Sequence, residues 1–306
     1  MNRKWIDKLK LPEGFRVPYF GGLLYRILNK KDNKIVQKTE FSGSVLNQEK
    51  RDFTITASLT SFPARIEYVH LAIKSIMRQT CKPDRIILWL AEEQFPEKQL
   101  PENLLALQKF GLEIKWCNDL CGHKKYFYCV RDQQPNELVI TFDDDMLYRD
   151  NCIAQLMAKH EKFPDCIICE RAQAVHFDKN GKLENPGAWK VISDIGVKTP
   201  SYSLNLSPGG GCLFPYHSLY EDACSEEKVR KLAYRADDLW CTFMAAQQGT
   251  RIIKTRKYHK IFSVIEGTQQ QQLAIGNVIN NEYMGTVDIL KNAYPVAYNR
   301  IITDRD

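Results

Sequence analysis

The sequence predicts an α/β domain with a mostly parallel central sheet and flanking helices. Strand-like and helix-like patterns alternate over residues 53–170, and several of the strand-like segments are continuous apolar runs. Strands joined by crossover helices form parallel sheets, and a strand that is covered on both faces needs no polar side. The chain has 306 residues, of which 44% are hydrophobic and 26% charged, so it can also build a large core.

The expected elements follow one another in a regular order. Segment 53–62 (FTITASLTSF) is apolar and β-branched, which predicts a strand and then a turn. Segment 65–80 carries apolar residues at three- and four-residue spacings, which predicts an amphipathic helix. Further strands are expected at 84–91, 112–117, 137–142, 165–170 and, singly or as a pair, within 250–267; further helices are expected at 101–111, 151–163 and 235–249. A hairpin turn is expected at Asn180-Gly181, and the tail from residue 268 shows little pattern.

The first fifty residues differ in charge from the remainder. They hold 11 Lys and Arg against 5 Asp and Glu, a net charge of +6 that equals the net charge of the whole chain. Aromatic and aliphatic residues, such as Trp5, Phe20 and Ile27, are interspersed among these charges. Such a segment suits an anionic membrane surface, although a solvated arm packed on the main domain would look similar. We expect residues 1–50 to form an appendage, residues 51–306 to form one domain, and nucleic acid not to be a partner.

The sequence shows neither a membrane span nor a signal peptide, and its cysteines lack the spacing of a zinc site. No stretch approaches the ~18 apolar residues of a membrane span, and the N-terminus lacks the apolar core of a signal peptide. We therefore expect a cytoplasmic protein, with peripheral contact with the inner membrane face. The ten cysteines are interpreted as reduced thiols, and the C-x-x-C of Cys166 and Cys169 as part of a buried strand rather than a zinc site.

The segment LVITFDDDMLY, residues 138–148, ends an apolar strand on three aspartates. Ligand sites of parallel sheets lie beyond the carboxyl ends of the strands. If strand geometry continues, Asp143 and Asp145 share one side while Asp144 points away. Two carboxylates on one side suit Mg²⁺ or Mn²⁺ together with phosphate oxygens. The alternative is an Asp-rich turn before a helix that Asp150 or Asn151 would also cap.

Two segments together resemble the nucleotide-sugar-dependent glycosyltransferases of the GT-A fold (Rossmann-like), in particular the family 2 type. They are AIKSIMRQTCKPDRIILWL, residues 72–90, and LVITFDDDMLY. In that family a helix ends in a Ser-x-x-x-Gln-Thr-like phrase, here residues 75–80, and an Asp-x-Asp closes a later strand. The resemblance covers residues 54–239. It implies a metal-dependent enzyme that moves a sugar from a nucleotide-sugar, with a UDP-sugar as donor, to a glycan or lipid-linked glycan.

The resemblance also implies roles for individual residues. The expected donor-binding residues are Thr60, Ser61, Phe62, Arg65, Lys124, Lys125, Asp143 and Asp144. The expected metal ligands are Asp145, Asp143 and, as in some GT-A enzymes, a late histidine, here His259. For Lys124 and Lys125 an exposed basic helix start is the alternative. The segment LWLAEEQFP, residues 88–96, departs from the Asp-Asp-Gly-Ser-like phrase that holds the nucleobase in the family, so the base stays unassigned.

A second acidic segment, YRADDLWCTF, begins an expected helix. In inverting members such a pair supplies the base that deprotonates the acceptor hydroxyl, which assigns catalysis to Asp238 and Asp237, with Asp238 favoured. The alternative is that acids in a first turn stabilise the helix dipole. The expected acceptor-binding residues are Gly209, Gly210, Gly211 and Trp240, although the glycines also suit a tight turn and the tryptophan suits a core.

Two other functions compete with the transferase. A sugar nucleotidyltransferase would use a similar sheet and metal, but it normally carries a glycine-rich loop after the first strand, and LTSFPARI, residues 59–66, has no glycine. A non-catalytic glycan-binding protein on a transferase-like fold is the other alternative. It would have no need to keep both acidic segments.

Overall fold

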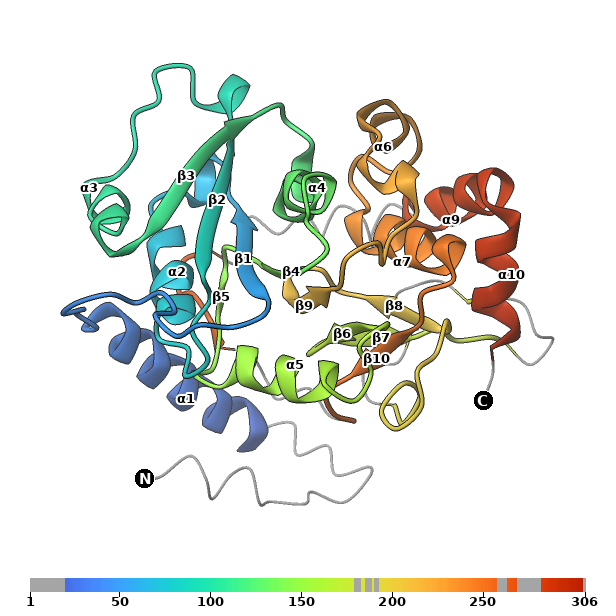
Figure 1. The fold of residues 1–306 in the computed structure, drawn as a ribbon, viewed down its shortest axis with the longest axis horizontal. Coiled ribbons are helices and arrows are strands. Elements are labelled where there is room, and N and C mark those ends of the chain that lie inside the picture. Colours follow the sequence, from blue (N-terminus) through green and yellow to red (C-terminus); the bar gives the residue numbers. More distant parts are fainter. Residues whose placement is uncertain are drawn as a thin grey trace.

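A seven-stranded sheet forms the centre of the molecule (Figure 1). The computed structural model describes residues 20–178, 183–184, 189, 193–257, 263–268 and 282–304. The strands of the sheet are β1 (Thr54–Thr60), β2 (Arg85–Ala91), β3 (Leu112–Cys117), β4 (Glu137–Phe142), β6 (Ile167–Cys169), β9 (Gly210–Phe214) and β10 (Ile252–Lys254). Their order is β10-β6-β9-β4-β1-β2-β3, and only β9 runs antiparallel to its neighbours in this sheet. The mostly parallel sheet that the sequence predicts is confirmed.

Two strand pairs lie outside this sheet. Strand β5 (Met146–Leu147) pairs antiparallel with β11 (Ser263–Val264), and β7 (Ala172–Ala174) pairs antiparallel with β8 (Leu204–Leu206). Strand β5 directly follows the three aspartates, so its pairing with β11 ties the acidic segment to a part of the chain more than a hundred residues further on.

Helices cover both faces of the sheet. The helices within the described residues are α1 (Phe20–Gln37), α2 (Val69–Met77), α3 (Glu102–Leu105), α4 (Lys124–Arg131), α5 (Cys152–His160), α6 (Glu226–Leu232), α7 (Asp237–Gln248), α9 (Glu282–Ala293) and α10 (Pro295–Thr303), and α1 packs against α2 and β11 rather than on this sheet. Because strand side chains alternate between faces, Ile140 joins the core under α2 and α5, whereas Val139 joins the core under α4 and α7. No helix within the described residues combines the length and the apolar character that crossing a bilayer requires.

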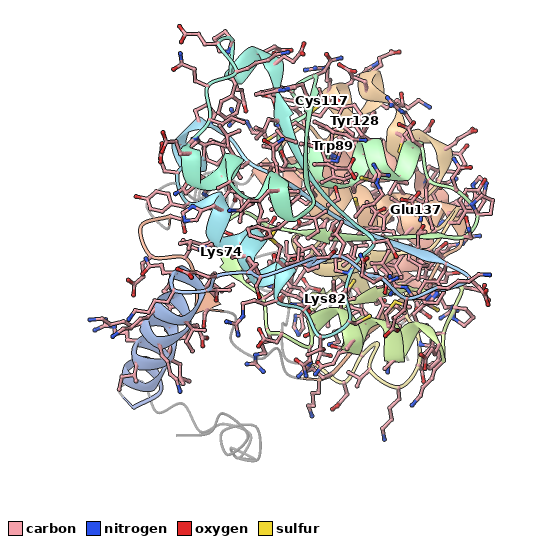
Figure 2. The ribbon with its side chains drawn as sticks, turned by 60° about the vertical axis from the view of Figure 1, so that its left-hand side comes forward. Lys74, Lys82, Trp89, Cys117, Tyr128 and Glu137 are labelled. Carbon is pink, nitrogen blue, oxygen red and sulfur yellow. The ribbon has the colours of Figure 1, made fainter. Side chains whose placement is uncertain are left out.

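Helix α4 is held firmly on the sheet, which matters because it carries two of the expected site residues. Tyr128 of α4 stacks on Trp89 of β2 with ring centroids 4.8 Å apart, and its hydroxyl donates to the Asn118 carbonyl at 3.1 Å. Figure 2 labels Trp89 and Tyr128 side by side near Cys117, at the end of β3. At the start of the helix, the Ser58 hydroxyl donates to the Lys125 carbonyl at 2.6 Å.

Three parts of the chain differ from the sequence prediction or lie outside it. The helix expected at 101–111 ends after Leu105, and a short 3₁₀ turn before Gly111, with a φ of +103°, replaces its second half. The tail forms α9 and α10, which bury only a few apolar residues each, such as Leu290 and Ile301, too sparse a pattern for a clear sequence signal. The predicted hairpin tip lies outside the described residues, but Phe177 and Leu183 on either side of it form an antiparallel bridge.

The amino-terminal segment and the cysteines can be placed in part. Residues 20–37 are helical, and the predicted division of the chain at residue 50 stays a prediction. All ten cysteines carry free thiols, and Cys169 of the C-x-x-C lies buried in β6, as the strand interpretation requires.

The Ser-x-x-x-Gln-Thr phrase has a structural role at the end of α2. Gln79 is fully buried; its amide nitrogen donates to the Arg149 carbonyl at 2.6 Å, and its amide oxygen accepts from the Ile153 backbone at 2.9 Å. The Ser75 hydroxyl accepts from the Tyr148 backbone at 3.1 Å, and the Thr80 backbone donates to the Asp150 carbonyl at 2.6 Å. The phrase therefore fixes the segment that follows the three aspartates.

We predict that Gln79→Ala lowers the free energy of unfolding by roughly 2–4 kcal/mol, because it leaves buried backbone groups of Arg149 and Ile153 without partners. The measurement is urea unfolding of the full chain. The exposed Gln134→Ala is the matched control and should change stability by less than about 0.5 kcal/mol. Equal stability of the two variants would contradict the role of Gln79.

Candidate active site

The three aspartates lie in the turn between β4 and β5 and do not continue the strand. The Asp143 backbone donates to the Gly209 carbonyl at 3.1 Å and to the Tyr148 hydroxyl at 2.6 Å. Asp144 is buried and accepts from the Ser61 hydroxyl at 2.6 Å and from Arg65 at 2.7 Å. The strand ends at Phe142, so period-two geometry no longer applies. The expectation that Asp144 points away from the site is therefore wrong.

Arg65 binds two of the three carboxylates. One guanidinium nitrogen pairs with Asp144, and another lies 3.1 Å from Asp145 Oδ2. Burial lowers the pKa of Arg65, but these carboxylates outweigh that effect and raise the pKa overall. The expected nucleotide-binding turn after β1 thus faces the acidic triplet. In the same turn, the Thr60 hydroxyl donates to the Trp89 carbonyl at 2.8 Å, and the guanidinium of Arg65 lies 5.5 Å from the centre of the Phe62 ring.

Lys125 joins the two acidic segments. Its ammonium nitrogen lies 2.6 Å from Asp143 Oδ1 and 3.0 Å from Asp237 Oδ2, and the side chain is buried. Burial lowers the pKa of Lys125, but Asp143 and Asp237 outweigh burial and raise it well above its ordinary value, so the group stays charged. The alternative of an exposed basic helix start does not apply to this residue.

Lys124 points elsewhere, although it is the neighbouring residue. It is buried and pairs with Asp119, which also accepts from the Tyr234 hydroxyl at 3.3 Å and from the Gln94 amide at 2.9 Å. Consecutive residues of a helix point about 100° apart, so both lysines cannot face the triplet. Lys124 therefore does not face the triplet, and its expected role at the donor site stays a prediction.

The two aspartates at the start of α7 differ in their surroundings. Burial raises the pKa of Asp237, but Lys125 and then His123 outweigh burial, so its pKa lies below the ordinary value. Burial and the adjacent charge of Asp237 raise the pKa of Asp238 to about 7. Both residues occupy the first helical turn, so the dipole also favours them. Of these two aspartates, only Asp238 has the pKa of a group that exchanges a proton near neutral pH.

Sequence reasoning missed two residues next to Asp238. The Tyr283 hydroxyl, from α9, donates to Asp238 Oδ2 at 3.4 Å. Arg171 is half-buried, and its positive charge lowers the pKa of Asp238. Arg171 follows β6 at the same sheet edge as the triplet, so a basic residue at a strand end was an available signal. Tyr283 lies in the tail and offered none.

The glycine segment approaches the acidic triplet closely. A Cβ atom on Gly209 would lie 1.8 Å from the carboxylate of Asp143, and a Cβ on Gly210 would lie 2.7 Å from the Cβ of Arg171. Gly211 has a φ of +85°, which favours glycine. The segment is thus both a tight turn and a wall of the site, and its expected contact with an acceptor stays a prediction.

Trp240 belongs to the core. The side chain has no exposed surface, its indole nitrogen donates to the Ala223 carbonyl at 3.3 Å, and its ring packs edge-on against Tyr294. An acceptor sugar cannot stack on a ring that is covered on both faces. The acceptor role expected for Trp240 is therefore wrong in this structure, and the core alternative holds.

The expectation that Asp143 and Asp145 hold a hard divalent cation stays a prediction. Burial and the nearby charge of Asp143 raise the pKa of Asp145 to about 6. A bound cation would offset the repulsion between the two carboxylates and lower this pKa. Among the described residues, no three His, Cys, Asp or Glu side chains converge as a metal site, and His259 lies outside these residues. A cation here would rest on two carboxylates and take its remaining ligands from substrate oxygens and water, which is common for Mg²⁺.

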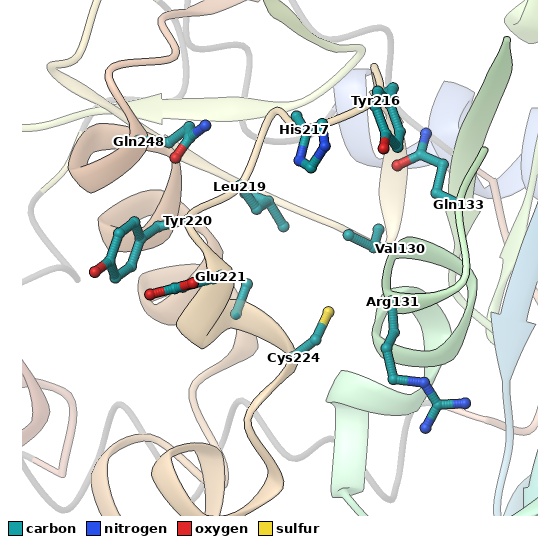
Figure 3. Close-up of a pocket in the computed structure, with 11 residues that line it drawn as sticks. Val130, Arg131, Gln133, Tyr216, His217, Leu219, Tyr220, Glu221, Cys224 and Gln248 are labelled. Carbon is teal, nitrogen blue, oxygen red and sulfur yellow. The ribbon is translucent and has the colours of Figure 1, made fainter. Parts of the chain in front are cut away.

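Two cavities lie away from the acidic site. The first, of about 650 Å³, is bordered by Arg131, Tyr216, His217 and Glu221 (Figure 3). The second, of about 530 Å³, shares Tyr216 and His217 with it and reaches Leu138, near the amino end of β4. Both are therefore at the sheet edge opposite the aspartates, and we place the candidate site by its chemistry rather than by cavity size.

Comparison with known proteins adds little to this geometry. No family model and no curated protein matches the chain. Similar solved structures include 4-diphosphocytidyl-2C-methyl-D-erythritol synthase from Anaerococcus prevotii, with 14% identity, a TM-score of 0.44, and coverage of 76% of this chain and 100% of that one. They also include S. aureus TarS residues 1–349, alone (12% identity, TM-score 0.42) and in complex with UDP (9%, 0.41). Each TarS match covers 69% of this chain and 59% of the TarS chain. At these TM-scores we rest the fold class on the sheet itself.

We predict that Gly209→Ala displaces the Asp143 carboxylate and lowers the free energy of unfolding by about 1–3 kcal/mol, because the added methyl group overlaps that carboxylate. Thermal and urea unfolding measure the loss. The control is Gly285→Ala in α9, where a Cβ meets nothing within 4 Å and helix propensity favours alanine by up to about 1 kcal/mol. If the two variants shift stability in the same direction, Gly209 does not have this packing role.

Proposed function

We propose that this protein is a metal-dependent glycosyltransferase. It would move a sugar from a nucleotide-sugar, with a UDP-sugar as the donor that the sequence resemblance implies, to a glycan or lipid-linked glycan. The observation that carries the proposal is the position of Lys125 between Asp143 and Asp237. This contact joins the turn that carries Asp143 and Asp145 to the helix start that carries Asp237 and Asp238, and the pKa of Asp238, about 7, suits a group that accepts a proton.

The donor side of the site would consist of the triplet and its two cations. Asp143 and Asp145 would hold Mg²⁺ or Mn²⁺, which when bound offsets negative charge on the departing nucleoside diphosphate. Arg65 and Lys125 now pair with these carboxylates. When a donor and its metal ion bind, the side chains of Arg65 and Lys125 would exchange a carboxylate oxygen for a phosphate oxygen. Ser61, which holds Asp144, lies in the turn expected to contact the nucleotide.

The acceptor side would centre on Asp238. A sugar hydroxyl is a weak nucleophile, and a carboxylate of pKa near 7 can take its proton at neutral pH while the oxygen attacks the anomeric carbon. The bond from that carbon to the diphosphate breaks, and the nucleoside diphosphate leaves with the electron pair. A single displacement of this kind inverts the anomeric centre. Tyr283 and Arg171 would position the carboxylate, and Asp237, held by Lys125, would keep its charge.

The same proposal covers the partners of the enzyme. We propose that residues 1–50 make peripheral contact with an anionic membrane, where a lipid-linked acceptor would be found. The nucleotidyltransferase alternative has no support from the turn after β1, which lacks glycine and whose Arg65 binds carboxylates. A non-catalytic glycan-binding protein would show no metal-dependent nucleotide binding by calorimetry.

We predict that the chain binds one nucleoside phosphate among UDP, GDP, CMP and dTDP at least tenfold more tightly with Mn²⁺ than without, because the cation joins two carboxylates to phosphate oxygens. Isothermal titration calorimetry measures each affinity. Asp145→Ala should abolish the metal effect, whereas the exposed Asp165→Ala should preserve it. Nucleotide binding that does not change with metal would contradict the donor site.

We predict that Asp238→Asn keeps donor affinity within about threefold but slows acceptor-dependent nucleotide release by roughly 10²–10⁴-fold, the usual contribution of a general base. In the wild type, kcat/KM should rise with pH through about 7, where Asp238 loses its proton.

A folding control separates loss of the base from loss of structure. The folded-state pKa of Asp238 lies above the ordinary value, so its stabilising effect is present at acid pH and lost as pH rises through about 7. Asp238→Asn removes the half-buried charge and should be at least as stable as the wild type at pH 8. Transfer at the wild-type rate by this variant would overturn the assignment of the base.

A further inference from the structure

Helix α1 is fixed to the domain by two buried asparagines on one face. The side chain of Asn29 accepts from the Val264 backbone at 2.7 Å, and the Asn33 amide donates to the Val264 carbonyl at 2.9 Å. The amide oxygen of Asn33 also accepts from the Glu266 backbone at 3.1 Å. These bonds attach the helix to strand β11 along that strand's open edge. They also fix the rotation of the helix about its axis, so the face turned outward is defined.

The outward face has an unusual composition. From residue 25 onward, the exposed residues of the helix are Arg26, Ile27, Lys30, Lys31, Lys34, Ile35 and Gln37. We call this set the outer face of α1. The only acidic residue of the helix, Asp32, lies on the other side and accepts from the Ser263 hydroxyl. The side chains of Ile27 and Ile35 are 56% and 40% exposed.

A face that only contacts water would be built differently. Solvated helices commonly set acidic and basic residues four apart, whereas here Arg26, Lys30 and Lys34 follow one another at that spacing and repel. The two isoleucines on the same face expose apolar surface to water, which is less favourable than burying that surface. A partner that is negatively charged and also accepts apolar side chains accounts for both features. The surface of an anionic bilayer has this combination of phosphate groups above acyl chains.

Hydrogen bonds and strand pairing connect α1, which carries the outer face, to the segment that follows the acidic triplet. Strand β11, which binds α1, pairs with β5, and β5 begins at the residue after Asp145. The Ile265 backbone also donates to the Asp145 carbonyl at 2.9 Å. In both overall views α1 lies at the margin of the molecule, outside the sheet (Figures 1 and 2). A surface bound to α1 would therefore hold the acidic triplet in a set orientation.

We propose that the outer face of α1 docks on an anionic lipid surface. Arg26, Lys30 and Lys34 contact lipid phosphates, and Ile27 and Ile35 enter the boundary with the acyl chains. The proposal takes the membrane contact of the proposed function and rests on it for its purpose. Its test, however, needs neither donor nor acceptor, so either idea can fail alone.

The experiment is co-sedimentation of the full chain with vesicles of phosphatidylcholine, with and without about one third phosphatidylglycerol. The test variant carries Arg26→Glu, Lys30→Glu and Lys34→Glu. The control variant carries Lys162→Glu, Lys198→Glu and Lys231→Glu, which are exposed lysines outside α1, and it has the same net charge as the test variant. A third variant carries Ile27→Ser and Ile35→Ser.

We expect the wild type and the control variant to bind the anionic vesicles, with no binding to neutral ones. Each lost positive charge should weaken binding by roughly fivefold, so the test variant, which loses three, should bind roughly a hundredfold more weakly. The isoleucine variant should bind more weakly too, and its remaining binding should disappear at ~0.5 M salt, where screening is strong.

Two results would overturn the proposal. One is binding of the test variant to anionic vesicles within threefold of the control variant. The other is unchanged vesicle binding by the isoleucine variant together with full displacement of the wild type by a soluble polyanion such as heparin. That result would assign the outer face to a dissolved polyanion instead. In each case, calorimetry of nucleotide binding on the same preparations reports separately on the proposed function.

Discussion

The buried ammonium of Lys125 is the interaction on which the candidate site depends. Two acidic segments far apart in the chain meet around it, and without a cation their carboxylates would repel in a poorly solvated place. The position of Lys125 is in turn secured by α4, through the Ser58 hydroxyl and the stacking of Tyr128 on Trp89. Packing on the sheet thus determines where the charge lies, and the charge determines that β4 and α7 share one site.

The carboxylates of the candidate site differ in whether a cationic side chain pairs with them. Asp143, Asp144, Asp145 and Asp237 each pair with Arg65 or Lys125. Asp238 has no such pairing with either cation, and burial together with Asp237 raises its pKa to about 7. A buried carboxylate with a raised pKa costs the folded state stability above neutral pH. Groups with such a cost are expected at functional sites rather than in ordinary core positions.

The segment after the acidic triplet links the site to the edge of the molecule. Gln79 fixes its backbone from α2, and β5 pairs with β11, to which Asn29 and Asn33 bind α1. The chain therefore has a continuous set of hydrogen bonds from the aspartates to an exposed basic helix. Through this connection, the position of the basic helix α1 is coupled to the position of the acidic segment.

The sequence by itself determined the mostly parallel sheet and the edge at which the aspartates lie, because both follow from local hydrophobic period and from the rule that parallel strands end together. It did not determine which charges pair. Lys124 and Lys125 look equivalent in the sequence, yet only Lys125 faces the triplet, and Trp240 beside the acidic pair is core. Tyr283 reaches Asp238 from a tail without a clear pattern. Only tertiary structure decides these points, because the direction of a side chain in a turn or helix start depends on contacts with segments remote in the chain.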